Sequence, residues 1–467
     1  MRHFTPLLLT LALTLGACEA TPPPVAPDAV APPPATVATT PPPAPPPADP
    51  ATATDGDVTV AWVNGLEILI KRIPGAELAA GHLYIRGGVR NWTAADAGLE
   101  DLALSTAASG GTEKLDKDAF TKRLAALGSS IGAASGNDYA SLRMTAIVKE
   151  WDTTFALLAD TFLHPALPAV ELEAHRQRSL AGLRHEQDSP DGRLRFAMHQ
   201  RLFAGHPYEN RSTGTLESLG KIQVADLGAH LARLRQASRL VFVATGDIDP
   251  AHVIDQVRST FGALPRGDYR EAPLPRVAFD KPSLSVVEQK LPTNYCQSMF
   301  IAPGYSEADY AQGLIAMNVL NDRLFDEIRT KRNLSYAPSA RLSANLSIGL
   351  GSLYVTAVDA DAARKVTLDE VKRLQSEPVS ERELTSAKST FLTGYLMENE
   401  TMSSQAGMIG RALLLGNDWH LARTLPEKIK AVTAADIQAF AKKYAGHLQT
   451  VVLGDAAKID RGLFGSM

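Results

Sequence analysis

The chain has 467 residues, of which 45% are apolar and 21% are charged, and its formal net charge is −4. This length allows two or more domains with complete hydrophobic cores, and the composition is that of an ordinary globular protein. The nearly neutral charge and the lack of a long basic run give no electrostatic basis for binding nucleic acid.

The first 18 residues have the features of a secretion signal. A short basic start precedes an apolar run at 7–15 that is too short to span a bilayer. The run leads into Leu15-Gly-Ala-Cys18, which resembles a bacterial lipobox and implies cleavage before Cys18 and lipidation of its thiol. Glu19 follows the cysteine, so the resemblance further implies attachment to the outer membrane, facing the periplasm. A plain signal peptide with a chance cysteine is the alternative.

Residues 19–56 are predicted to form a linker rather than a folded domain. The tract is rich in proline, alanine and threonine and contains several Pro-Pro-Pro runs. Proline holds such a chain extended, at roughly 3 Å per residue, so the linker would act as a semi-rigid spacer on the order of 100 Å long. If Cys18 carries lipid, Cys296 has no partner, because the chain has only these two cysteines.

The folded region is predicted to begin at residue 57. Two runs typical of β-strands flank Asn64-Gly65 and indicate a tight hairpin, at 58–63 and 66–70. Further strands are expected at 83–86, at 141–148 and at 240–249, where the strand runs into a turn. Helical spacing of apolar residues occurs at 98–109, 117–127, 151–162, 169–187, 192–203 and 250–261.

Three segments recur in the same order, at a nearly constant spacing of about 210 residues. The earlier copies start at Pro168, Val224 and Val243, and the later copies start at Pro378, Thr433 and Val451. This pattern predicts the duplication of a domain that contains helices and strands. The predicted boundaries are 57–265 for the first copy, 266–283 for a proline-containing linker, and 284–467 for the second copy.

The stretch from 323 to 336 is the most informative part of the second copy. Apolar residues recur every three or four positions from 314 to 328, which predicts a half-buried helix that ends near Asn333. Arg329 and Tyr336 are therefore expected at a helix end and at the start of the next extended segment. Two alternatives are structural: Arg329 could pair with Asp326, and Tyr336 could pack on the sheet.

Several features together resemble the M16B peptidases and the proteins similar to mitochondrial processing peptidase. They are the duplicated halves, Gly98-Leu99 at a helix start, His206-Pro-Tyr208, Gly246-Asp247 and the stretch with Arg329 and Tyr336. The resemblance covers nearly all of 58–467. It implies an α+β fold of two M16-type domains, each a mainly antiparallel sheet covered by helices.

The zinc motif of that family is missing from this chain. The family has His-x-x-Glu-His on the helix that here begins at Gly98, and residues at i and i+4 of a helix reach one metal ion. The two histidine positions correspond to Asp101 and Ser105, and the glutamate corresponds to Leu104. The third ligand, a glutamate on a later helix, corresponds to a position at or near Gly182. Leucine and glycine cannot bind zinc and serine is a poor ligand, so we expect no metal cofactor and no independent peptidase activity.

A different metal site is a weaker possibility. Four histidines occur within one region, His175, His185, His199 and His206. Their spacings of ten and seven residues do not place two of them on one helix face in the way that i and i+4 do. Solvated or structural histidines are the preferred interpretation.

The resemblance implies a division of labour between two subunits. This chain would be the non-catalytic subunit of a heterodimeric zinc peptidase, and the partner would carry His-x-x-Glu-His and the zinc. An extended peptide would lie along a sheet edge, while Arg329 and Tyr336 hold its backbone and stabilise the tetrahedral intermediate. The alternatives are a scaffold or binding lipoprotein without a proteolytic role, and a stand-alone hydrolase with unrecognised ligands.

Overall fold

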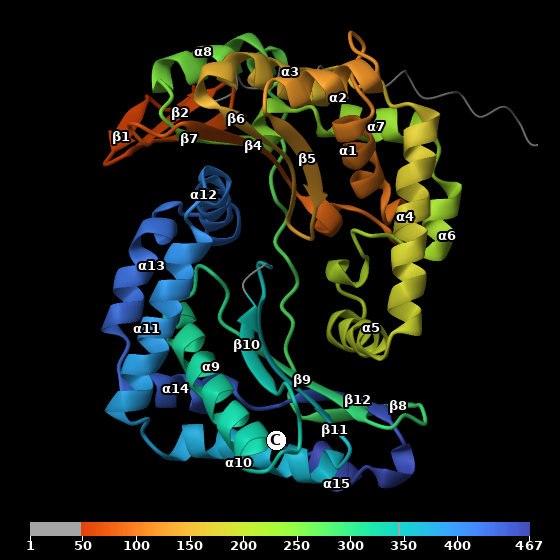
Figure 1. Ribbon diagram of the computed structural model, residues 1–467, viewed down its shortest axis with the longest axis vertical. Coiled ribbons are helices and arrows are strands. Elements are labelled where there is room, and N and C mark those ends of the chain that lie inside the picture. The colour runs from red at the N-terminus through yellow and green to blue at the C-terminus, as the bar shows by residue number, and fades with distance from the viewer. Residues whose placement is uncertain (1–47, 344–345) are drawn as a thin grey trace, which may run out of the picture. The chain divides into compact units, whose positions relative to one another are not determined.

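The computed structural model describes residues 48–343 and 346–467 (Figure 1). The expected signal peptide with Cys18, and most of the expected linker, lie outside the described residues. Residues 49–467 form one compact unit. Within the described part of the chain, no helix is long and apolar enough to cross a membrane.

The first half of the described chain builds a mixed sheet in the order β1-β2-β3-β7-β4-β6-β5. Its strands are β1 (Ala53–Asp55), β2 (Val58–Val63), β3 (Leu66–Arg72), β4 (Leu78–Arg86), β5 (Ser130–Ser135), β6 (Tyr139–Ile147) and β7 (Leu240–Gly246). The predicted hairpin is confirmed, because β2 and β3 pair antiparallel. In the turn between these two strands, Asn64 has a φ angle of 53° and Gly65 a φ angle of 86°, as a tight turn of this kind requires.

The second half repeats the order β3-β7-β4-β6-β5 with five strands, and no strand of its sheet corresponds to β1 or β2 among the described residues. Its sheet has the order β10-β11-β9-β12-β8, with β8 (Ser283–Glu288), β9 (Asn294–Ala302), β10 (Ser339–Ser343), β11 (Gly349–Ala357) and β12 (Gln449–Gly454). In each sheet one strand pair is parallel, β3 with β7 and β8 with β12, and the strands beyond are antiparallel. The predicted α+β duplication with mainly antiparallel sheets is therefore confirmed.

Helices cover both sheets (Figure 1). Those of the first half are α1 (Leu99–Ser109), α2 (Lys117–Ala126), α3 (Trp151–Leu163), α4 (Ala169–Asp188), α5 (Pro190–Phe203), α6 (Leu216–Lys221), α7 (Val224–Leu234) and α8 (Pro250–Ser259). Those of the second half are α9 (Tyr310–Leu324), α10 (Ala360–Ser376), α11 (Glu381–Glu398), α12 (Met402–Gly416), α13 (His420–Ala431), α14 (Ala434–Tyr444) and α15 (Arg461–Phe464).

Two helices pack on the sheet of the other half. Helix α12, from the second half, contacts β4 and β7 of the first sheet. Helix α5, from the first half, contacts β12 and β9 of the second sheet, where its Leu194 and Met198 share a buried cluster with Val451 and Leu453. The two halves therefore hold each other through a reciprocal exchange of helices, and apolar burial of this kind is the main favourable term in folding.

The sequence prediction differs from the structure at two places near the candidate site. Strand β5 was not predicted, because its small residues, Ser-Ile-Gly-Ala-Ala-Ser, have little strand propensity. The helix expected to end near Asn333 is α-helical only to Leu324, and a π-helical segment (Phe325–Thr330) follows. The turn after it brings Asn333 into a left-handed conformation with φ 50°.

Candidate functional site

Arg329 and Tyr336 lie against each other at the end of the π-helical segment. The guanidinium carbon of Arg329 is 3.9 Å from the centre of the Tyr336 ring and 5.2 Å from that of Phe325. Arg329 Nη1 also donates a hydrogen bond to the backbone oxygen of Tyr336. The Tyr336 side chain is nevertheless 78% exposed. The contact therefore fixes the cation and the aromatic ring together while the phenol faces solvent.

Neither structural alternative for this pair is observed. Asp326 pairs with Lys331 at 2.8 Å instead of with Arg329. Tyr336 does not pack on the sheet, because most of its surface is exposed. A π-helical turn inside a helix is uncommon and occurs often at functional sites. Here Arg329 lies within the π-helical segment.

The positions that correspond to the family's zinc ligands lie on α1 and α4. Leu104 is completely buried in the core of the first half, and Asp101 and Ser105 are half-buried on the same helix. Gly182 is exposed on α4, which packs against α1. Burial, together with the negative charge of Glu100, raises the pKa of Asp101 above its usual value.

These residues do not fit a zinc ion. Leu104 and Gly182 offer no side-chain donor, which leaves one carboxyl and one hydroxyl group. Across residues 48–343 and 346–467, no three His, Cys, Asp or Glu side chains are grouped so that they could hold a metal ion. His175 Nε2 instead forms a hydrogen bond with Ser109 Oγ at 2.8 Å, and His206 Nε2 with the Pro275 oxygen at 3.2 Å. Both histidines thus make ordinary structural contacts.

A buried polar network beside α1 was missed by sequence reasoning. Glu100 is 3% exposed, accepts a hydrogen bond from Trp92 Nε1 at 3.1 Å, and lies 3.2 Å from Nε2 of the fully buried His230. The network ties α1 to α7. Glu100 and His230 are 130 residues apart, and no local pattern links them, so only the fold could reveal the pair.

Strand β5 forms one edge of the first sheet, because it pairs with β6 alone among the described strands. It also lies against α1. Edge strands present free backbone N–H and C=O groups that can pair with another extended chain. The degenerate metal positions and an available sheet edge are thus neighbours in the first half.

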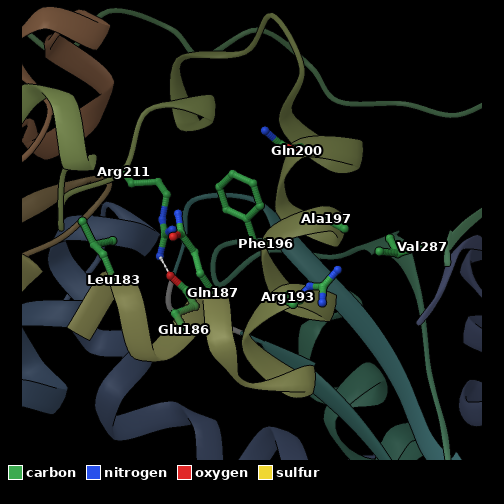
Figure 2. A pocket seen from close by; sticks show the side chains of 9 residues that line it. All are labelled: Leu183, Glu186, Gln187, Arg193, Phe196, Ala197, Gln200, Arg211 and Val287. Atoms are coloured by element: carbon green, nitrogen blue, oxygen red, sulfur yellow. Dashed lines mark hydrogen bonds and ion pairs between the residues drawn. The ribbon is translucent and has the colours of Figure 1, made fainter. Parts of the chain in front are cut away.

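A cavity of 340 Å³ opens beside the C-terminal half of α4 (Figure 2). Leu183, which directly follows Gly182, lines it together with Phe196 of α5 and Val287 of β8. Figure 2 shows Arg211 directed at Glu186, with which it forms a 2.6 Å ion pair. The lining is mostly apolar, and the cavity is large enough for a bulky side chain.

The structure therefore brings Arg329 and Tyr336 together, and it brings α1 and α4 together. Among the described residues, no hydrogen bond or ion pair joins these two groups.

Comparison with known proteins identifies the family. Residues 67–216 match the insulinase family (peptidase family M16), and residues 221–391 match the peptidase M16 inactive domain. A relative from Helicobacter pylori, the non-peptidase homolog YmxG, is 25% identical over 372 residues, which cover 78% of this chain and 85% of the relative. An uncharacterized zinc protease of Mycobacterium tuberculosis is 25% identical over 413 residues, which cover 85% of this chain and 92% of the relative.

The fold agrees with this assignment. A solved structure of a peptidase M16 inactive domain from Pseudomonas fluorescens superimposes with a TM-score of 0.77 at 20% identity, covering 85% of this chain and 98% of that chain. The degenerate positions on α1 and α4 lie within residues 67–216, the part of the chain that matches the insulinase family. The chain belongs to the peptidase M16 family, as a non-catalytic member.

Proposed function

We propose that this protein is the substrate-binding subunit of a heterodimeric M16 zinc peptidase, and that its Arg329 and Tyr336 complete the active site of a partner that carries zinc. The observation that carries the proposal is the exposed, preassembled arginine–tyrosine pair in a chain that lacks the zinc ligands. Because the chain lacks these ligands, we infer that another chain supplies the metal to the pair.

The chemistry of the pair suits an oxyanion. Arg329 keeps a permanent positive charge, and its guanidinium group has no carboxylate partner among the ion pairs of the described residues. The Tyr336 hydroxyl would donate a hydrogen bond to the same oxygen. The edge of β5 offers backbone pairing for an extended peptide, and the cavity beside Phe196 offers room for one of its side chains.

The proposal is tested with a mixture of this chain and an M16 chain that contains His-x-x-Glu-His. This chain alone should not cleave a peptide at the rate of the two-subunit mixture. In the mixture, Arg329→Ala should lower the cleavage rate, and Tyr336→Phe should lower it by at least about tenfold. Arg332→Ala is the matched control, because Arg332 is an exposed neighbour that pairs with Glu327. Unchanged rates in both variants would favour the scaffold alternative. Stoichiometric zinc and cleavage in the lone chain would favour the stand-alone hydrolase.

The site of action is part of the same proposal. We place the protein at the bacterial cell envelope, anchored through lipid on Cys18 and facing the periplasm. Replacement of Cys18 by serine should move the protein from the membrane fraction to the soluble periplasmic fraction. Continued membrane association of this variant would contradict lipid anchoring.

A further inference from the structure

A second cavity lies where α12 packs on the first sheet, and it has a different character from the cavity beside α4. Its volume is 490 Å³, within the range of small-ligand sites. Strands β4 and β6 contribute His82, Tyr139 and Arg143, and α12 contributes Ser403 and Arg411. The cavity is therefore built by both halves of the chain and is distinct from the Arg329–Tyr336 pair.

Two arginines give this cavity a positive charge. Neither Arg143 nor Arg411 forms an ion pair among the salt bridges of the described residues. Arg143 uses its Nε to donate a 3.0 Å hydrogen bond to Ser141 Oγ, which leaves its two terminal nitrogens available. The first turn of α12, a helix of 15 residues, adds the positive end of the helix dipole.

Neutral donors complete the lining. Burial raises the pKa of Tyr139 even though Arg411 and Arg143 oppose the shift, so this phenol keeps its proton and can donate it in a hydrogen bond. His82 is only 1% exposed, and burial together with the charge of Arg143 lowers its pKa to about 3. The imidazole is therefore uncharged at neutral pH.

The uncharged His82 positions a serine hydroxyl. Its Nδ1 lies 3.1 Å from the Tyr84 hydroxyl, and its Nε2 lies 2.9 Å from Ser403 Oγ. The Tyr84 hydroxyl donates to the Ala406 backbone oxygen at 3.4 Å, so the ring proton of His82 is on Nδ1 and is donated to Tyr84. Nε2 of His82 then accepts the hydroxyl proton of Ser403.

We propose that this cavity binds the terminal carboxylate of a peptide. Two guanidinium forks match the two oxygens of a carboxylate, and the Tyr139 hydroxyl supplies a further donor. The volume greatly exceeds that of a single oxyanion and accommodates the last side chain as well. Glu398, an exposed carboxylate that also lines the cavity, disfavours a dianion such as phosphate more than a singly charged carboxylate.

The probe is the tripeptide N-acetyl-Ala-Ala-Tyr with a free C-terminal carboxylate, titrated into the purified protein at pH 7 by calorimetry. The same peptide with a C-terminal amide, and inorganic phosphate, are titrated in parallel. We expect the acid to bind at least about tenfold more tightly than the amide, and more tightly than phosphate. Equal affinity for acid and amide, tighter binding of phosphate, or no binding of the acid would each overturn the proposal.

Variants assign the binding to this cavity. Arg143→Gln and Arg411→Gln should each weaken acid binding about tenfold, whereas Glu398→Gln should strengthen it a few-fold. Arg382→Gln, at an exposed arginine of α11, is the matched control and should change nothing. Unchanged affinity in both cavity variants would refute the assignment. Arg329→Ala should bind the tripeptide acid with unchanged affinity, although it should lower peptide cleavage in the two-subunit mixture. Failure of this inference is therefore distinguishable from failure of the proposed function.

Discussion

Asp138 is a buried carboxylate that joins the two halves, and its removal provides the sharpest test of how they are held together. The residue is 3% exposed and ends the turn between β5 and β6. It accepts hydrogen bonds from the Tyr208 hydroxyl, from Ser347 Oγ at 2.7 Å and from the Ser347 backbone at 3.1 Å. Arg90 Nη1 donates to it at 3.2 Å. Ser347 lies just beyond β10, the strand that follows Tyr336.

Asp138→Ala should lower the free energy of unfolding by about 3 kcal/mol. Removal of one partner of a buried ion pair typically costs about 3–5 kcal/mol, because the other charge is left without compensation. Arg90 retains a hydrogen bond to the Ala272 oxygen at 2.6 Å and a contact with Glu271 at 3.7 Å, which places the cost at the lower end. The donors on Tyr208 and Ser347 also lose their acceptor.

The assay is equilibrium urea unfolding followed by tryptophan fluorescence, and the chain has four tryptophans. The control is Asp369→Ala on α10. Asp369 pairs with Lys365 at 2.9 Å, but the two side chains are 53% and 71% exposed, so its loss should cost less than about 1 kcal/mol. If Asp138→Ala shifts the urea midpoint no further than Asp369→Ala, the carboxylate does not hold the halves together and the reasoning fails.

Three further predictions concern other parts of the fold. Burial raises the pKa of the Cys296 thiol to about 12. In a variant whose other cysteine is replaced by serine, this thiol should not react with Ellman's reagent at pH 8 until urea is added. Rapid labelling of the folded protein would contradict this prediction. Partial burial by itself would raise the pKa of Glu383. Hydrogen bonds from Arg323 and from the N-cap of α11 have the larger effect and lower the pKa to about 2. Because a lowered carboxyl pKa stabilises the fold above about pH 4.5 and loses this effect as the pH falls toward 2, Glu383→Gln should cost about 1 kcal/mol at pH 7, after allowance for solvent screening, and less at pH 3. A cost that does not change between these pH values would exclude the ion pair as its source. Gly410→Ala in α12 should lower the melting temperature, because the added methyl group meets a buried tyrosine ring of β4. Gly394→Ala in α11 should raise the melting temperature slightly, because there is open space at this position. Equal shifts in the two variants would mean that the close packing at Gly410 is not required.

Local chemistry was sufficient for much of the fold. The turn at Asn64-Gly65 and the strands on either side follow from side-chain periodicity and from the ease with which these two residues adopt positive φ. The repeated segments indicated two copies of one topology, and the sheets have that shared order. The absence of zinc ligands is also a property of residue types alone, since Leu104 and Gly182 have no donor atoms in any fold.

Other features depend on distant parts of the chain meeting. Strand β5, with its small residues, becomes a strand because it pairs with β6, a partner that offers backbone hydrogen bonds whatever the side chains are. The pairing of Tyr336 with Arg329 was a prediction about two residues seven apart, but the π-helical segment that carries Arg329 and the exposure of the Tyr336 ring were not predicted. His82 and Ser403 are 321 residues apart, and no periodicity could have joined them.

The sequence by itself therefore determined many of the local elements, the duplication and the loss of the metal ligands, because each depends on residue types or short spacings. The tertiary structure alone decided that α5 and α12 each pack on the sheet of the other half. An apolar helix face specifies that it must be buried but not against which sheet, since burial of apolar area has no direction. That exchange of helices creates the cavity between α12 and the first sheet, and with it the site for which we propose a ligand.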